Sequence, residues 1–306
     1  MNRLHHALFA LLLTAAPATA QQRPATTPQP SDLLRRSLER ISQGVRADWG
    51  IYIKSLETGE EVGINADAVM DTMSVIKVPL LVEAFRQMDA GTLQLTDPIE
   101  MKSADKRSGT GVLRTLDDGL RITFKDALTL MIIQSDNTAT DMVFARVGGP
   151  ARVTQAMREL GLETITATGT TFDWFRALGA AGDRERFHWE GKTPFGLASA
   201  RDLGRLLEKI ARNEAARPAA CAEMLRILRA QQMNTRIPKY LTGAATPHKT
   251  GDFPPYIAND VGLIETPRAR VVVVFFSARH RGIYAQLEDA IARMSEQVWA
   301  YFNYRQ

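Results

Sequence analysis

The sequence predicts an α+β protein: an antiparallel sheet flanked by N- and C-terminal helices, with an inserted all-helical domain. Two observations predict this class. β-Branched and aromatic runs occur near both ends of the chain, whereas apolar residues between them recur mostly at helical spacing. A sheet assembled from both ends must enclose the helical part. We expect the sheet domain to comprise residues 31–72 and 230–306 and the helical domain residues 73–229.

Residues 1–30 are expected to precede the folded part. Arg3, an apolar run over residues 7–16 and the small residues Ala18 and Ala20 form the pattern of a secretory signal peptide, residues 1–20. Residues 21–30 are rich in Pro, Thr and Gln and predict a flexible tether. The apolar run is short for a permanent membrane helix, although an uncleaved anchor is the alternative. We therefore expect a secreted or periplasmic protein without a stable membrane anchor.

The first elements are a helix, a hairpin and a long helix. The first helix begins at Ser31-Asp32, whose side chains can cap it. Residues 51–53 and 61–64 then form a β-hairpin that turns at Glu57-Thr58-Gly59. From Ser74 the apolar spacing is helical as far as Met88.

Three further helices are marked by their ends. Thr123 and Asp126 form a capping box for residues 124–134. A helix over residues 137–146 stops at Gly148-Gly149, and Pro150 opens the next one. Ser199 caps a helix that runs to about Asn213. After these, residues 261–264 and 271–276 predict adjacent antiparallel strands, and residues 284–301 a final amphipathic helix.

Composition excludes several functional classes. The net charge of +4 is spread along the chain without a Lys/Arg block, so we expect no nucleic-acid partner. Cys221 is the single cysteine, which excludes an intrachain disulfide. No metal-binding motif or glycine-rich phosphate loop occurs, so we expect no metal and no cofactor. We expect a monomer that acts on a small-molecule or peptide substrate.

Three short motifs carry chemistry. They occur in the order Ser74-Val75-Ile76-Lys77, Ser135-Asp136-Asn137 and Lys249-Thr250-Gly251. Roughly one S-x-x-K is expected by chance in a chain of this length, and Ser103 to Lys106 supplies a second. The joint occurrence of all three motifs in this order is far rarer.

The residue types in these motifs suit an acyl-transfer site. Ser74 and Lys77 lie one helical turn apart on the same face. A serine hydroxyl needs a neighbouring base, and a buried lysine becomes one when desolvation and a nearby cation such as Lys249 lower its pKa. Ser135 can relay the proton, and Asn137 can orient Lys77 and the substrate.

Each motif also has a structural alternative. Ser74 and the Ser135 motif can simply cap helices, and Lys249 can be a solvated strand residue. In the catalytic alternative, the backbone N–H groups of Ser74 and Asp252 form the oxyanion hole.

From about Ser31 to its end the chain resembles the class A β-lactamase family. Beyond the three motifs, the similarity includes Gly148-Gly149-Pro150, Thr193-Pro194 and Asn259-Asp260-Val261-Gly262. The resemblance implies a β-lactamase/transpeptidase-like architecture with the active site at its seam. It implies the following roles: Ser74 as nucleophile, Lys77 and Ser135 as proton carriers, and Lys249, Thr250, Gly251 and Asp252 on the substrate side.

One segment departs from that family. Members carry Glu-x-x-x-Asn before Thr-Pro, and this Glu activates the deacylating water. Alignment on Asp173 puts Arg176 in place of the Glu and Ala180 in place of the Asn, with Glu190 as a candidate partner for Arg176. We therefore expect hydrolysis of the acyl-enzyme to be slow.

Two neighbours of the third motif affect the substrate side. The carboxylate of Asp252 should repel a substrate carboxylate unless an arginine compensates, and Arg279 and Arg281 are the candidates. His248 alternates with Lys249 along the strand, so we expect it on the opposite face in a structural role.

Three functions remain open from the sequence. The first is a β-lactamase-type hydrolase that opens a β-lactam amide through Ser74. The second is a D,D-peptidase or esterase with the same acylation chemistry. The third is a penicillin-binding protein that is acylated and does not turn over.

Overall fold

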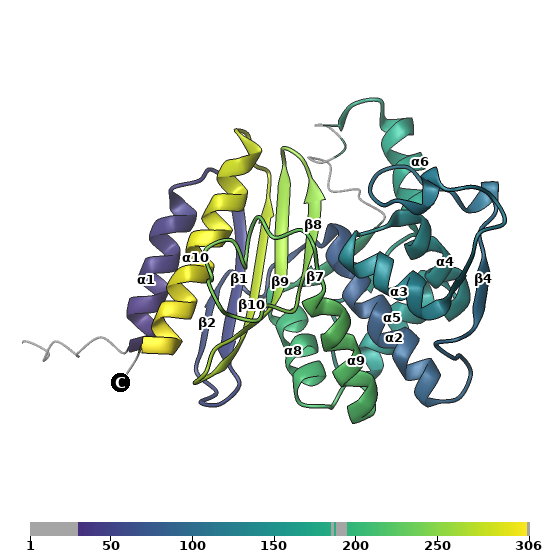
Figure 1. The fold of residues 1–306 in the computed structure, drawn as a ribbon. Helices are drawn as coiled ribbons and strands as arrows, with labels where there is room; N and C mark the ends of the chain where they lie inside the picture. The colour runs from purple at the N-terminus through teal and green to yellow at the C-terminus, as the bar shows by residue number, and fades with distance from the viewer. Residues whose placement is uncertain (1–29, 185–186, 188–194, 305–306) are drawn as a thin grey trace, which may run out of the picture.

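The computed structural model describes residues 30–184, 187 and 195–304. Figure 1 shows its arrangement, with helices on both sides of a central sheet and a larger helical region beyond one side. The elements in chain order, with η marking 3-10 helices, are α1 (Pro30–Gln43), β1 (Asp48–Ser55), β2 (Glu61–Ile64), β3 (Val69–Asp71), η1 (Met73–Ile76), α2 (Lys77–Asp89), β4 (Pro98–Glu100), η2 (Ser103–Asp105), η3 (Leu113–Thr115), β5 (Arg121–Thr123), α3 (Phe124–Ile133), α4 (Asn137–Val147), α5 (Gly149–Glu159), β6 (Thr166–Ala167), α6 (Thr171–Ala181), β7 (Gly196–Ser199), α8 (Ala200–Ala211), α9 (Pro218–Arg229), β8 (His248–Phe253), β9 (Ile257–Glu265), β10 (Arg270–Ala278) and α10 (Tyr284–Tyr304).

The main sheet joins the two ends of the chain. Its strand order is β2-β1-β10-β9-β8, and every neighbouring pair is antiparallel. β1 pairs with β10 from Asp48 opposite Ala278 to Ser55 opposite Val271. The predicted α+β class is therefore confirmed, and the sheet is assembled from both ends as expected.

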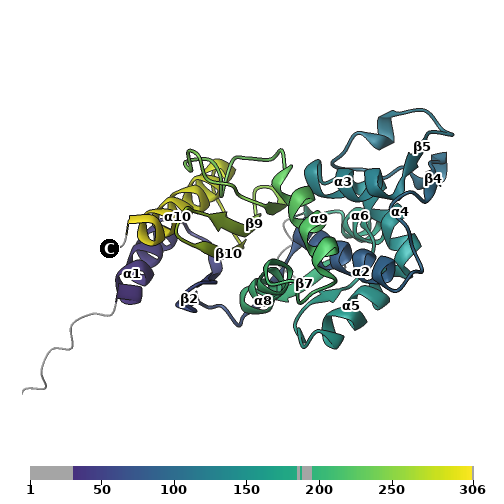
Figure 2. The same ribbon diagram turned by 60° about the horizontal axis from the view of Figure 1, so that its bottom comes forward.

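Helices cover both faces of this sheet. α1 and α10 lie side by side on one face, as Figures 1 and 2 show. Their apolar residues, including Leu38 and Leu287, form one core cluster with Ile53 and Val273 of the sheet. α8 contacts β1 and β10 and belongs to the other cluster, so this helix packs on the sheet although its residues fall in the span predicted as the helical domain.

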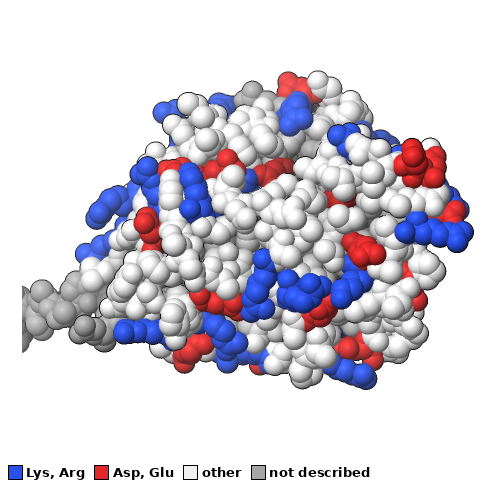
Figure 3. All heavy atoms as spheres, viewed as in Figure 1, with Lys and Arg blue, Asp and Glu red and all other residues white. Residues whose placement is uncertain are grey.

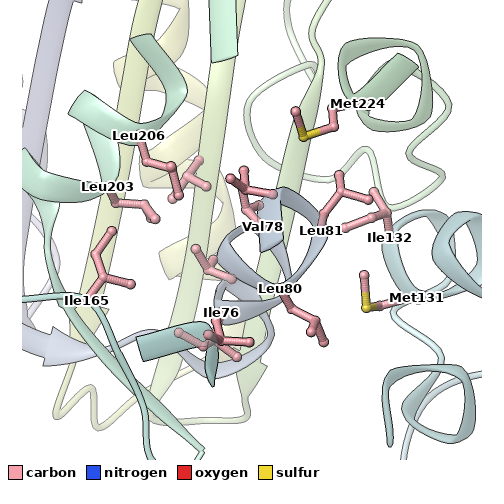
Figure 4. Packing of buried hydrophobic residues seen from close by; sticks show 14 of the residues in the cluster. Ile76, Val78, Leu80, Leu81, Met131, Ile132, Ile165, Leu203, Leu206 and Met224 are labelled. Atoms are coloured by element: carbon pink, nitrogen blue, oxygen red, sulfur yellow. The ribbon is translucent and has the colours of Figure 1, made fainter. Parts of the chain in front are cut away.

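The second core cluster continues from the sheet into the helical region. Figure 4 shows Leu203 of α8 near Ile165, and Leu81 of α2 near Ile132 of α3; Leu206 and Val78 belong to the same cluster. One continuous apolar core thus connects the sheet to α2, the helix that follows Ser74.

Three predicted helix ends agree with the structure, whereas Ser31 and Asp32, predicted to cap the first helix, lie within α1. The Thr123 hydroxyl accepts from Asp126 N at 3.1 Å, and the Asp126 carboxylate accepts from Thr123 N at 2.9 Å, which completes the capping box. Gly148 ends α4 with a left-handed φ of 93°, a conformation that suits glycine. The Ser199 side chain caps α8 as predicted.

The inserted region is not wholly helical. β4 pairs with β5, and a three-stranded sheet has the order β3-β7-β6. These strands have two to four residues each, too few for an alternating pattern to stand out in the sequence. Of the N-terminal predictions, Pro30 is the first residue of α1 and not the end of the tether, and the signal peptide and residues 21–29 lie outside the described residues.

Charge and burial fit an ordinary protein surface. Figure 3 shows Lys and Arg side chains interspersed with Asp and Glu over the face in view. Cys221 is buried in α9 as a free thiol. Within the described ranges, no helix is long and apolar enough to cross a bilayer, and no three potential metal ligands cluster.

Candidate active site

Ser74 lies on the 3-10 turn η1, which runs directly into α2. Met73, just before it, has a left-handed φ of 45°, an unfavourable conformation for a residue with a side chain. The Met73 N–H donates to Asp71 Oδ1 at 2.8 Å and helps to hold this turn. Strained backbone of this kind is concentrated at functional sites, and Ser135 (φ 52°) is a second example in this one.

A cavity of about 560 Å³ opens in front of Ser74. Ser135, Asn137 and Asp252 line it together with the nucleophile candidate, so residues of the first two motifs meet there with the residue that directly follows the third. A larger hollow of about 710 Å³ near Trp49 and Arg201 contains no residue of the three motifs. We take the smaller cavity as the site because the reactive groups are there.

Lys77 is completely buried beneath this cavity. Its Nζ lies 2.8 Å from Ser135 O, 3.0 Å from Ser135 Oγ and 3.0 Å from Asn137 Oδ1. Burial, followed by the charge of Lys249, lowers the pKa of Lys77 well below its ordinary value. A neutral amine has two N–H donors and one lone pair. It can therefore donate to the two carbonyl oxygens and accept a proton from a hydroxyl.

Lys249 reaches the same hydroxyl from β8. Its Nζ donates to Ser135 Oγ at 3.1 Å and to Thr250 O at 2.8 Å. Burial lowers the pKa of Lys249 to about 8, while the Asp252 and Asp260 carboxylates counteract that effect. Ser135 Oγ therefore lies between two lysines, of which Lys77 loses its proton more readily.

The Ser135 motif is held by backbone and loop contacts. Asp136 caps α4 by accepting from Ala139 N at 2.9 Å, and its other oxygen accepts from Val112 N at 2.7 Å. Asn137 Nδ2 donates to Ser108 O at 2.8 Å. Capping and site construction are thus combined here, so the structural alternative for this motif is correct for Asp136 and incomplete for its neighbours.

β8 packs closely against the turn that carries Ser74. A Cβ added to Gly251 would lie 2.5 Å from Thr72 O and 3.2 Å from Ser74 N, so only glycine allows this approach. Thr250 is fully buried, and its hydroxyl donates to Met233 Sδ at 3.3 Å. Of the four residues predicted on the substrate side, Asp252 lines the cavity; substrate contact by Lys249, Thr250 and Gly251 stays a prediction.

The segment aligned with the family's catalytic glutamate forms helix α6. The Arg176 side chain is 72% exposed, and among the described residues its acidic partner is Asp173, at 3.8 Å. The Arg176 side chain therefore points to solvent. The residues of α6 that line the cavity are Thr171, Trp174 and Phe175. The predicted partner Glu190 lies outside the described residues.

Aromatic rings line this side of the cavity. Trp174 makes edge-to-face contacts with Phe175, Phe187 and Phe253 at centroid distances of 4.9, 5.8 and 5.2 Å. The Arg184 guanidinium lies over the Phe253 ring at 4.7 Å. An apolar acyl group would be desolvated against this wall.

Arg236 is the residue that sequence reasoning missed. It is 2% exposed, lines the cavity and donates through Nη2 to Asp252 Oδ1. Arg279, one of the two arginines predicted for this role, pairs with Asp48 at 3.1 Å instead, and Arg281 does not line the cavity. The prediction of Arg279 or Arg281 is therefore wrong. Arg236 lies in an irregular segment after α9, where no periodic pattern indicates its direction.

His248 has the structural contacts expected for it. Its Nδ1 lies 2.9 Å from Asp260 Oδ1, and its Nε2 lies 3.2 Å from Asn234 Oδ1. Asp260 Oδ2 in turn accepts from Ile237 N at 3.1 Å. These bonds fix the segment that carries Arg236.

The sheet with its helical insert, and a serine at a helix start beside a buried lysine, define the class of β-lactamase-like serine hydrolases. Residues 33–302 match the Beta-lactamase enzyme family. Because this match covers most of the chain, the protein belongs to that family.

Individual relatives agree with this membership. A β-lactamase of Rhodobacter capsulatus is 29% identical over 132 residues, which are 43% of this chain and 45% of that protein. The matched segment thus spans less than half of this curated relative. The crystal structure of a β-lactamase from Sphaerobacter thermophilus is 28% identical and has a TM-score of 0.76 over 87% of this chain and 96% of that one. A mutant of PBP-A, in an acyl-enzyme complex with penicillin G, is also 28% identical, with a TM-score of 0.76 over 89% and 96%.

Proposed function

We propose that this protein is an exported serine hydrolase of the β-lactamase type, in which Ser74 forms an acyl-enzyme with an amide or ester carbonyl. One observation carries the proposal: Ser74 and Ser135 face one cavity, and both buried lysines bond to Ser135 Oγ within 3.1 Å. The β-lactam amide is the first substrate to test, since the family is that of β-lactamases.

The proposed acylation proceeds by nucleophilic attack. Neutral Lys77 takes the Ser74 proton as Ser74 Oγ bonds to the carbonyl carbon. As the C–N bond breaks, Lys77 returns this proton to Ser135 Oγ, 3.0 Å away, while Ser135 gives its own proton to the leaving nitrogen. Lys249 stabilises the negative charge that develops. Gly251 lies against Ser74 N, which supports an oxyanion hole formed by the N–H groups of Ser74 and Asp252.

Release of the acyl group is the step that distinguishes the alternatives. Deacylation needs a base that can reach a water molecule beside the ester. The described face of α6 offers Thr171, Trp174 and Phe175, none of which is such a base. This observation favours slow turnover of β-lactams. It also favours the third candidate, a penicillin-binding protein that remains acylated. A D,D-peptidase or esterase would need a base other than these residues of α6 for the same step.

Incubation with a chromogenic cephalosporin, followed by colour and intact mass, tests the proposal. We expect a burst of colour and a stable mass adduct. Ser74→Ala should give no adduct, whereas Ser103→Ala, in the other S-x-x-K, should be acylated like the wild type. Persistence of the adduct in Ser74→Ala would refute the nucleophile. Continuous colour would indicate an efficient β-lactamase. Release of D-Ala from a peptide, or cleavage of an ester, without an adduct would indicate the second candidate.

A further inference from the structure

The cavity wall next to Ser74 presents a carboxylate whose partners are all internal. Asp252 Oδ1 accepts hydrogen bonds from Arg236 Nη2 and from the Tyr284 hydroxyl. The Asp252 side chain is 30% exposed, and it follows Gly251, which touches the nucleophile turn. A carboxylate therefore lines the same cavity as Ser74 and directly follows the residue that touches the nucleophile turn.

Arg236 holds this carboxylate through Nη2, while its Nε is buried without a hydrogen-bond partner among the described residues. Its Nη1 donates to Asn259 O at 2.7 Å, and its Nη2 also reaches Tyr284 Oη at 2.8 Å and Glu288 Oε1 at 3.3 Å. Its side chain is 3% exposed and faces two carboxylates, Asp252 and Glu288, of which Glu288 also lines the cavity. The charge of Arg236 thus faces two carboxylates. Lys249, the other cation that acts on Asp252, is fully buried and donates to Ser135 Oγ and Thr250 O.

A second group that could receive a carboxylate is also occupied. The Thr250 hydroxyl is buried and donates to Met233 Sδ at 3.3 Å.

Burial works to raise the pKa of Asp252, but the charge and hydrogen bond of Arg236 outweigh it and hold that pKa below its ordinary value. Asp252 is therefore ionised at neutral pH and stays negative.

We propose that Asp252, fixed by Arg236 and Tyr284, is a specificity-determining residue that disfavours acyl donors with a free carboxylate beside the scissile bond. The preferred substrates are amides or esters whose leaving-group side is uncharged at that point, such as a peptide that continues as an amide. In penicillins the carboxylate is attached to the carbon next to the cleaved nitrogen, so it must approach Asp252. This inference rests on the proposed acylation of Ser74.

The test compares two probes that differ in this one group: penicillin G, with a free carboxylate, and its methyl ester. In both, a bond forms from Ser74 Oγ to the lactam carbonyl, the C–N bond breaks, and the ring nitrogen takes the serine proton. Acylation is followed by intact mass, and each rate is divided by the rate of alkaline hydrolysis of the same probe. We expect the wild type to prefer the ester by about 10-fold, the size of a like-charge contact at a partly solvated site.

Asp252→Asn removes the charge with little change in shape. We expect it to shift the acid-to-ester rate ratio by about 10-fold toward the acid, because Arg236 then meets the substrate carboxylate instead. Asp48→Asn removes the same charge outside the cavity and should leave the ratio at the wild-type value. Dividing the acid-to-ester rate ratio of each variant by that of the wild type cancels the intrinsic reactivities of the two probes.

The outcomes separate the two proposals. Adducts from both probes with the acid reacting as fast as the ester in the wild type, or an unchanged ratio in folded Asp252→Asn, would overturn the specificity role and leave the acylation proposal standing. No adduct and no turnover of either probe would overturn acylation of these substrates by Ser74 and the inference with it. The wild-type comparison needs no variant, so it remains decisive if Asp252→Asn fails to fold.

Discussion

At the residue scale, the two lysines of the site have unequal protonation. Lys77 is the more strongly shifted, because the nearby charge of Lys249 adds to its burial. Lys249 keeps more of its basicity because the Asp252 and Asp260 carboxylates support its charge. The site therefore contains one amine suited to accept a proton and one ammonium suited to stabilise negative charge.

This inequality predicts a bell-shaped pH dependence of acylation. The rate should rise as Lys77 becomes neutral with increasing pH, and fall above about 8, where Lys249 loses its proton. Acylation rates with the uncharged penicillin G methyl ester between pH 5 and about 9.5 measure this. Lys249→Arg keeps the positive charge at high pH, so the decrease of the acylation rate at high pH should be absent in this variant. A wild-type rate that stays constant across the pKa of Lys249 would contradict its role as an ammonium.

Residue identity could be predicted at this scale only where a motif marks it. The three motifs indicated Ser74, Lys77, Ser135 and Lys249, and the structure brings the last three into one hydrogen-bonded cluster below the cavity that Ser74 lines. Arg236 and the aromatic wall were not predictable. Their position depends on tertiary packing of an irregular segment and of α6, neither of which leaves a spacing rule in the sequence.

At the element scale, α6 decides which side chains face the acyl group. Alignment alone put Arg176 in the place of a catalytic base, but the helical phase of residues 171–181 turns Arg176 outward and Phe175 inward. A Cβ on Gly109 would lie 2.7 Å from Phe175 Cζ and 2.6 Å from Asn137 Nδ2, so Phe175 reaches the site.

A pair of adjacent substitutions tests this phase. Phe175→Glu puts a carboxylate beside Asn137 and should speed loss of the acyl adduct on the order of 100-fold if a general base is what deacylation lacks. Arg176→Glu introduces the same side chain at the next position, which faces solvent, and should leave the rate of adduct loss unchanged. Intact mass against time after removal of excess penicillin G measures both. Acceleration by Arg176→Glu alone would mean that α6 is rotated from the orientation described above.

The approach of β8 to η1 is a second constraint at this scale. Gly251→Ala introduces a methyl group 2.5 Å from Thr72 O, so β8 must move away from the nucleophile turn. We expect a loss of about 1–3 kcal/mol of stability and a lower acylation rate. Gly179→Ala, a glycine of α6 with no atom near its added Cβ, should be neutral or slightly stabilising. Thermal melting and acylation rates check both, and an unaffected Gly251→Ala would show that the close approach is not required.

At the scale of the whole molecule, the site requires the helical region and the sheet to keep a fixed position relative to each other. Ser74 and Ser135 come from the helical region, and Lys249 and Asp252 from the edge strand of the sheet. Strand pairing between the chain ends was predictable from composition, because β-branched runs are strong signals. The packing of α8 on the sheet was not, since helical periodicity indicates an apolar face and does not name its partner.

The shared core predicts that sheet and helices unfold together. Leu206 of α8 is fully buried in the cluster that reaches from β1 and β10 to α2 and α3, so Leu206→Ala should cost about 2–5 kcal/mol. Because that cluster supports both regions, urea should abolish far-UV circular dichroism and the capacity for Ser74 acylation at one midpoint, lowered equally for both in the variant. Leu287→Ala, in the cluster under α1 and α10, is the matched control and should also shift a single transition. Two separate transitions, of which Leu206→Ala moves only one, would show that the regions unfold independently and that the cavity is held together by something other than this core.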